Sequence, residues 1–198
     1  MSDPRANPKR ALMVGSAWMM ASRWTMKGLG FLSTLVMARL VLPADYGIVA
    51  MAFLALGLIQ AFLDFSVATA LLRKDEVSRQ EIDSAWTLRI LQSVLISMFL
   101  LLSSPYVAMY FEEPRVVYVL WTLSICVVFA GAGNIGLVLA QKQLDFSLEF
   151  RHQVICRVLS VSATVSSGFW LGDYRALVIG ISTAYVSGFI FSYTMQSY

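Results

Sequence analysis

Long apolar runs, separated by short polar connections, constrain this chain more than any other feature of its sequence. The hydrocarbon core of a bilayer is roughly 30 Å thick, so a helix that crosses it needs about 20 mainly apolar residues. Six segments meet this requirement: residues 12–42, 44–71, 84–110, 116–140, 150–171 and 176–193. The sequence therefore predicts an all-α integral membrane protein, a bundle of six transmembrane helices that follows a cytoplasmic tail of residues 1–11.

Composition agrees with this class. Hydrophobic residues make up 58% of the 198 residues, charged residues 14%, and the mean hydropathy is +0.70, which differs from soluble globular usage. The first segment contains Arg23 and Lys27, but dividing it there leaves two pieces too short to cross, so one tilted helix is expected. A signal peptide is the alternative interpretation of this segment, although no A-x-A-like cleavage site follows it.

The basic residues predict the orientation. With the amino terminus inside, the inner segments hold eight basic residues and the outer connections hold two, Arg115 and Arg175, as the positive-inside rule requires. Aromatic residues such as Tyr110, Trp121 and Trp170 lie near the predicted outer ends. Both termini are therefore predicted to face the cytoplasm.

Residues that would indicate catalysis or a cofactor are scarce. His152 is the single histidine, and Cys126 and Cys156 form no C-x-x-C unit, so no metal site, cofactor or enzyme is predicted. Residues Gly131 to Gly136 match G-x-G-x-x-G, but they lie inside the fourth apolar segment, which favours close helix packing over dinucleotide binding. The net charge of +3 reflects loop anchors and indicates no nucleic-acid partner.

Polar residues inside the expected spans are informative, because each is costly in hydrocarbon and must face protein or a water-filled cavity. Four expected helices carry such residues along one face. They are Ser16, Arg23, Lys27 and Thr34 on the first, Gly57, Gln60 and Asp64 on the second, Arg89, Ser93 and Ser97 on the third, and Gln153, Arg157, Ser160, Thr164 and Ser167 on the fifth. The pattern predicts a bundle around a polar cavity. The alternative is that the charges snorkel to the inner headgroups or pair internally, as Asp64 could with Arg23.

Depth along the helices refines this prediction. Counting from the inner ends places the cations of the first, third and fifth helices in the cytoplasmic half or near the middle. The predicted anion-binding residues are Arg23, Lys27, Arg89 and Arg157, with Ser16, Gln60, Ser93, Ser160 and Thr164 as polar lining. Arginine binds phosphate through paired hydrogen bonds, so an anionic, phosphate-bearing ligand is expected. Asp64 would pair with one of these cations or carry a coupling proton.

The junction between the first two spans resembles a known family. Its residues are Ala38, Arg39, Leu40, Val41, Leu42, Pro43, Ala44, Asp45, Tyr46 and Gly47. They resemble the A-R-x-L-x-P-x-[DE]-[FY]-G junction of Wzx-type polysaccharide flippases, in the multidrug/oligosaccharidyl-lipid/polysaccharide (MOP) exporter superfamily. Pro43 suits the first turn of a helix, and Asp45 suits its positive end. The resemblance continues in order through residues 70–75, 110–114 and 141–146.

The resemblance implies a MATE-like fold of two six-helix lobes around a central cavity, in the bacterial inner membrane. It also implies a substrate, undecaprenyl-diphosphate-linked oligosaccharide, which such proteins export for polysaccharide or lipopolysaccharide biosynthesis. Arg23 matches a basic residue common in the family. Because family members are about twice as long, this chain is expected to be the amino-terminal lobe, completed by a carboxyl-terminal lobe or a second copy.

Two other functions fit the same features. A multidrug-type exporter lobe would share the scaffold, although a cation exporter would want acids in its cavity rather than arginine and lysine. A non-transporting membrane scaffold of a polysaccharide assembly complex would make the buried cations dispensable.

Overall fold

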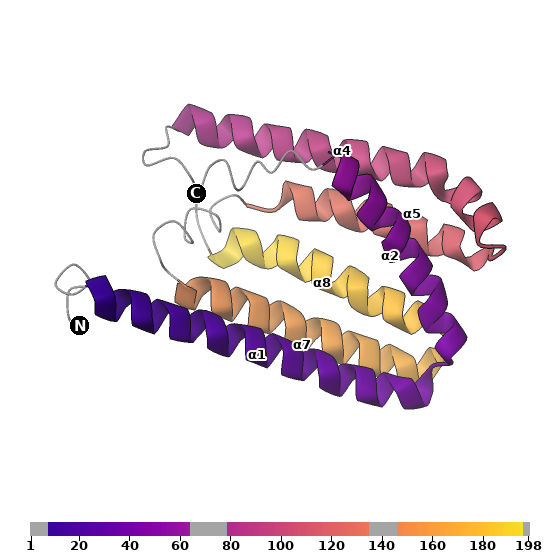
Figure 1. Ribbon diagram of the computed structural model, residues 1–198, viewed down its shortest axis with the longest axis horizontal. Coiled ribbons are helices and arrows are strands. Elements are labelled where there is room, and N and C mark those ends of the chain that lie inside the picture. Colours follow the sequence, from indigo (N-terminus) through magenta and orange to yellow (C-terminus); the bar gives the residue numbers. More distant parts are fainter. Residues whose placement is uncertain (1–7, 64–78, 135–145, 196–198) are drawn as a thin grey trace.

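The computed structural model describes residues 8–63, 79–134 and 146–195, and every regular element within those ranges is an α-helix (Figure 1). The helices are α1 (Pro8–Leu40), α2 (Pro43–Leu63), α4 (Arg79–Tyr110), α5 (Arg115–Ala132), α7 (Phe146–Leu171) and α8 (Tyr174–Met195). Each expected span overlaps one of them, and residues 64–71 and 135–140 of those spans lie outside the described ranges. The predicted all-α membrane bundle is confirmed.

Five of these helices, all except α1, are long and apolar enough to cross a membrane. Their outward surfaces are strongly apolar, since Phe62 is 86% exposed, Leu102 63% and Trp170 92%. Apolar side chains exposed on this scale would aggregate in water but suit a lipid environment. The helix α1 is not among the five; it is the helix that carries Arg23 and Lys27.

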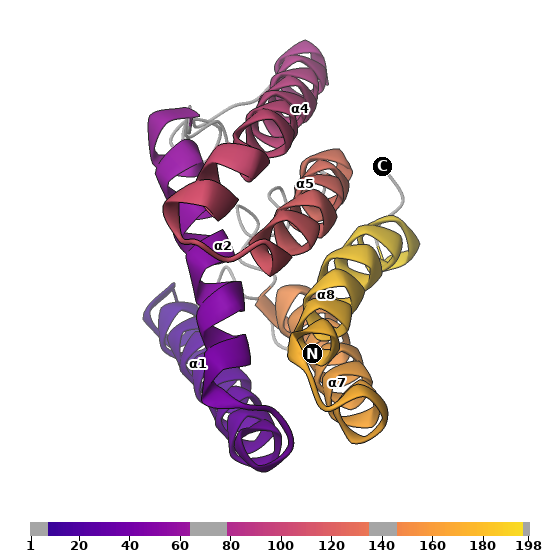
Figure 2. The same ribbon diagram turned by 90° about the vertical axis from the view of Figure 1, so that its right-hand side faces the viewer.

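Seen along the helix axes, α4, α5, α8, α7 and α1 follow one another in a curved row, and α2 crosses beside it (Figure 2). The packing agrees with this order: α4 contacts α5, α5 contacts α8, α8 contacts α7 and α7 contacts α1, while α2 contacts α4, α5 and α8. The helices α1 and α4 therefore lie at opposite ends of the row.

The core lies where α2 crosses α4 and α5. Ile48 and Ala52 of α2 pack there with Leu100 of α4 and with Leu120 and Leu123 of α5, and each is at most 1% exposed. Burial is greatest along α5, which has neighbours on three sides. A polar contact also joins α5 to α4: Nε1 of Trp121 donates a 3.0 Å hydrogen bond to Oγ of Ser104.

Short connections gather at one end of the bundle, on the right of Figure 1. The α1–α2 junction, the α4–α5 turn and the α7–α8 turn all lie there. The α7–α8 turn depends on Gly172, whose φ of 62° is a left-handed conformation that glycine adopts without a steric penalty. The opposite end holds the beginnings of α1, α4 and α7 and the ends of α5 and α8.

Candidate functional site

Arg157 lies in the contact between α7 and α1. A Cβ built on Gly30 would lie 2.5 Å from Nη2 of Arg157, so the guanidinium occupies the space that the missing side chain leaves. The Nε atom of Arg157 is buried and has no hydrogen-bond partner among the described residues. A buried guanidinium N–H without an acceptor is costly, which makes this atom a candidate ligand-binding donor.

Arg23 and Lys27 lie on the same helical face as Gly30, seven and three residues before it on α1. At about 1.5 Å per residue, all three positions fall within roughly 11 Å along the axis. Both side chains are exposed. The structure thus brings three of the predicted cations to one pair of helices, and we refer to Arg23, Lys27 and Arg157 as the cationic edge.

Arg89 is placed elsewhere, in the contact between α4 and α5. Its Nη2 donates a 2.9 Å hydrogen bond to the carbonyl oxygen of Ala130, in the last turn of α5. Tyr193 of α8 donates a 2.8 Å bond to the carbonyl of Ala132 in the same turn. A cation at a helix carboxyl terminus satisfies an otherwise unpaired carbonyl and interacts favourably with the helix dipole. Arg89 therefore has a structural role that the sequence analysis did not anticipate.

The ion pairs found within the described ranges involve none of the four predicted anion-binding cations. They join Arg115 to Asp45 and Glu113, and Arg175 to Asp173. Asp64, the predicted partner of a cavity cation, lies outside the described residues.

The predicted polar lining is placed mainly between helices. Ser93 of α4 packs directly against Gly131 of α5, and Thr164 of α7 packs directly against Gly180 of α8. Oγ of Ser160 also donates a 2.8 Å bond to the carbonyl of Gly180. Gly131, the first glycine of the G-x-G-x-x-G stretch, therefore serves close helix packing, as expected for a small residue in a membrane helix.

The two remaining lining residues lie on other helices. Gln60 is exposed on α2, and Ser16 belongs to a part of α1 whose side chains lie outside the described part of the structure. That the five predicted polar lining residues face a transport path stays a prediction.

The family junction forms the α1–α2 connection. Pro43 is the first residue of α2 and Asp45 lies in its first turn, as the helix-capping rules predict. Asp45 is 5% exposed, and the buried hydroxyl of Tyr46 has no described partner. Arg39 lies before this connection and is exposed in the last turn of α1, and Gly47 lies after it, in α2.

The same end of the bundle gathers charged and aromatic side chains. Arg115 contacts Asp45 and Glu113, and Arg175 contacts Asp173. Exposed aromatic residues surround them: Tyr106, Tyr110, Tyr118, Trp121 and Trp170. Such a belt is typical of the level where a membrane meets water.

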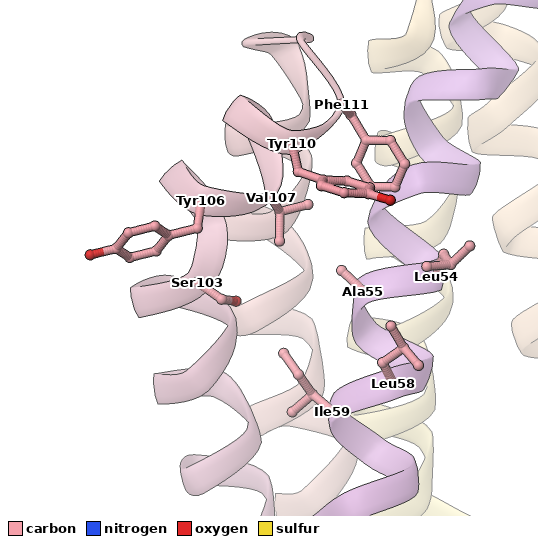
Figure 3. A pocket seen from close by; sticks show the side chains of 9 residues that line it. All are labelled: Leu54, Ala55, Leu58, Ile59, Ser103, Tyr106, Val107, Tyr110 and Phe111. Carbon is pink, nitrogen blue, oxygen red and sulfur yellow. The ribbon is translucent and has the colours of Figure 1, made fainter.

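Two cavities are candidate ligand sites, and they differ in the charge of their lining. One, of about 310 Å³, lies between α2 and α4 and is lined chiefly by apolar side chains such as Leu58, Ile59 and Val107, with Tyr110 and Phe111 at one end (Figure 3). It offers no charged group. The other, of about 280 Å³, lies at the end of α5 and is lined in part by Arg89 and His152.

No group of three or more histidine, cysteine or acidic side chains in the described ranges could hold a metal ion. Cys126 and Cys156 are buried, unpaired thiols, and Nε2 of His152 lies 3.2 Å from the carbonyl oxygen of Gly188.

Together, the helical bundle, its membrane-length apolar helices and its lipid-compatible exterior define a multi-pass α-helical membrane protein. A family model described as "Polysaccharide biosynthesis protein" matches residues 36–198, and the chain belongs to that family. The resemblance to Wzx-type polysaccharide flippases, identified from the junction residues, is thereby confirmed.

Two curated relatives agree with this assignment. The teichuronic acid biosynthesis protein TuaB of Bacillus subtilis (strain 168) is 27% identical over 120 residues, which cover 61% of this chain and 25% of the relative. The lipopolysaccharide biosynthesis protein WzxC of Escherichia coli (strain K12) is 22% identical over 180 residues, or 90% of this chain and 37% of the relative. The chain thus spans less than half the length of the curated relatives it matches. No solved structure matches it significantly.

Proposed function

We propose that this chain is one lobe of a transporter, not an enzyme, that moves lipid-linked oligosaccharide units across the bacterial inner membrane for polysaccharide or lipopolysaccharide assembly. The observation that carries the proposal is the cationic edge: Arg23, Lys27 and Arg157 lie on one helix pair of a membrane protein from a polysaccharide biosynthesis family.

The chemistry of the edge suits a polyprenyl diphosphate. A lipid-linked sugar keeps its chain in the bilayer and its diphosphate at headgroup depth, where it needs cationic donors. Arg157 offers a planar guanidinium whose buried Nε has no hydrogen-bond partner within the described ranges. On α1, the exposed Lys27 and Arg23 add charge about one and two turns before Gly30. A drug-cation exporter would require acidic residues in its cavity, whereas these three residues are basic.

The lobe is proposed to work with a complement. Helix α1 contacts the bundle chiefly through α7, and the side chains of Arg23 and Lys27 remain exposed, so both can reach a further element. A second six-helix lobe, or a second copy of this chain, would complete the cavity around the substrate. Both termini are proposed to face the cytoplasm, where the substrate is loaded.

Transport in a flippase-deficient strain tests the proposal. A full-length transporter containing this lobe should lose most surface polysaccharide and accumulate inner-leaflet substrate when it carries Arg23→Gln and Lys27→Gln together. Each charge-assisted contact contributes about 1.5–3 kcal/mol, or about ten- to a hundredfold in affinity. Arg151→Gln, which removes an exposed charge at the start of α7, is the matched control. Normal export by the double variant at normal expression would refute the transport role of the cationic edge and favour a scaffold.

A further inference from the structure

The cavity at the end of α5 lies apart from the cationic edge. It has a volume of about 280 Å³ and lies between the last turn of α5, the first turns of α7 and the final turns of α8. Polar lining comes from Arg89, Asn134, His152, Tyr185 and Ser192, and apolar lining comes chiefly from Phe129 and Phe189. The lining therefore combines polar and aromatic side chains, as an amphiphile requires.

Arg89 gives this cavity its positive charge. It is the one formally charged residue of the lining, and the ion pairs found in the described ranges do not include it. The single hydrogen bond described for it goes to the carbonyl of Ala130, whereas a guanidinium carries five N–H donors. A partly buried cation without a carboxylate partner is best stabilised by an external anion.

The location identifies the kind of anion. The cavity adjoins the end of α5. That helix ends on the side of the bundle away from the short connections (Figure 1). Next to the cavity on α8, Val186 is 37% exposed and Ile190 is 50% exposed. Apolar side chains beside a cationic cavity can hold an acyl chain while the cavity holds the headgroup phosphate.

We propose that this cavity binds one anionic phospholipid of the leaflet at this end, with its phosphate on Arg89 and its acyl chain along the exposed face of α8. His152 and Asn134 border the headgroup space and supply polar contacts to the glycerol. This site is separate from the transport function and holds whether or not the chain moves a lipid-linked cargo.

Native mass spectrometry of the full 198-residue chain in detergent tests the site, with phosphatidylglycerol and phosphatidylcholine as probes. We expect one tightly retained phosphatidylglycerol, and about tenfold weaker retention in Arg89→Gln, because a charge-assisted contact is lost. Gly188→Leu should have the same effect with Arg89 in place: Gly188 lines the cavity, and a Cβ there meets nothing within 4 Å.

Two control variants separate lipid binding from a structural effect. Tyr193→Phe removes the other cap of α5 without altering the cavity lining, and Arg151→Gln removes a nearby exposed charge. Both should retain phosphatidylglycerol as the wild type does. Equal loss in Tyr193→Phe, equal retention of phosphatidylcholine, or displacement of the lipid by millimolar glycerol phosphate would each overturn the proposal.

Discussion

Nη1 of Arg115, the first residue of α5, lies 3.4 Å from Oδ1 of Asp45 in the first turn of α2, 70 residues earlier in the chain. The carboxylate is nearly buried, with 8% of its side chain exposed, whereas the arginine is 48% exposed. This contact holds the family junction against the α4–α5 turn, since the same arginine also pairs with Glu113. Asp45 thus lies at the positive end of α2 and pairs with a cation from another helix.

Arg115→Gln should lower the thermal unfolding temperature in detergent, because it leaves a nearly buried carboxylate without its cation. Arg175→Gln is the matched control, and it should lower the unfolding temperature less, since its pair with Asp173 is more exposed. Equal decreases would mean that the burial of Asp45 does not strengthen its pair.

Acid should weaken the same turn. Hydrogen bonds from Nε and Nη2 of Arg115, at 2.8 and 2.9 Å, hold the pKa of Glu113 below its ordinary value. A carboxyl group whose pKa is lower in the folded chain stabilises the fold above its unfolded pKa of about 4.3, and this stabilisation is lost as the pH falls through the folded pKa. Unfolding temperatures measured from pH 7 to pH 3 should therefore fall less in Glu113→Gln than in the wild type.

Close helix packing predicts a contrast among glycines. Alanine at Gly131 or Gly180 would collide with Ser93 or Thr164 of the neighbouring helix, and overpacking of this kind costs about 1–3 kcal/mol. Alanine at Gly57, where a Cβ meets nothing within 4 Å, should be neutral or stabilise the helix by up to about 1 kcal/mol. Thermal unfolding in detergent measures the three stabilities. If Gly57→Ala were the least stable of the three variants, the contacts of Gly131 with Ser93 and of Gly180 with Thr164 would be contradicted.

Local rules made much of the fold predictable. The period and length of the apolar runs define the helices, and proline at the first position and an acid in the first turn define the start of α2. These features depend on neighbouring residues alone. The pairing of Asp45 with Arg115 could not be predicted, because nothing in the sequence relates residues 70 positions apart.

The candidate site was less predictable for a different physical reason. A helix face that packs closely on another helix needs small and hydroxylated residues, and so does a face that lines a polar cavity. Ser93 and Thr164 therefore gave the same signal as cavity residues, although the structure packs them against glycines. The sequence predicts Arg89 as a cavity cation but does not show that α5 ends beside it, where its guanidinium bonds the carbonyl of Ala130.

The orientation in the membrane is a further prediction. Reporter fusions within residues 73–80 and 142–149 should read as cytoplasmic, and fusions within residues 112–115 and at Asp173 as periplasmic, because basic residues concentrate on the first set of connections. Fusion to an alkaline phosphatase and to a fluorescent protein gives complementary readouts. One inverted connection would overturn the six-span topology.

Gly30→Ala should impair transport while leaving the fold intact. The new methyl group would approach Nη2 of Arg157 to 2.5 Å and displace the guanidinium, which is the far end of a flexible side chain and can move at little cost. The phosphate-binding geometry of Arg157 would then be lost although its charge remains, so surface polysaccharide in the flippase-deficient strain should fall while the unfolding temperature stays near that of the wild type. Gly28→Ala, two residues away on α1 with nothing within 4 Å of its Cβ, should transport normally. Normal export by Gly30→Ala would remove Arg157 from the substrate path and leave Arg23 and Lys27 to act without it.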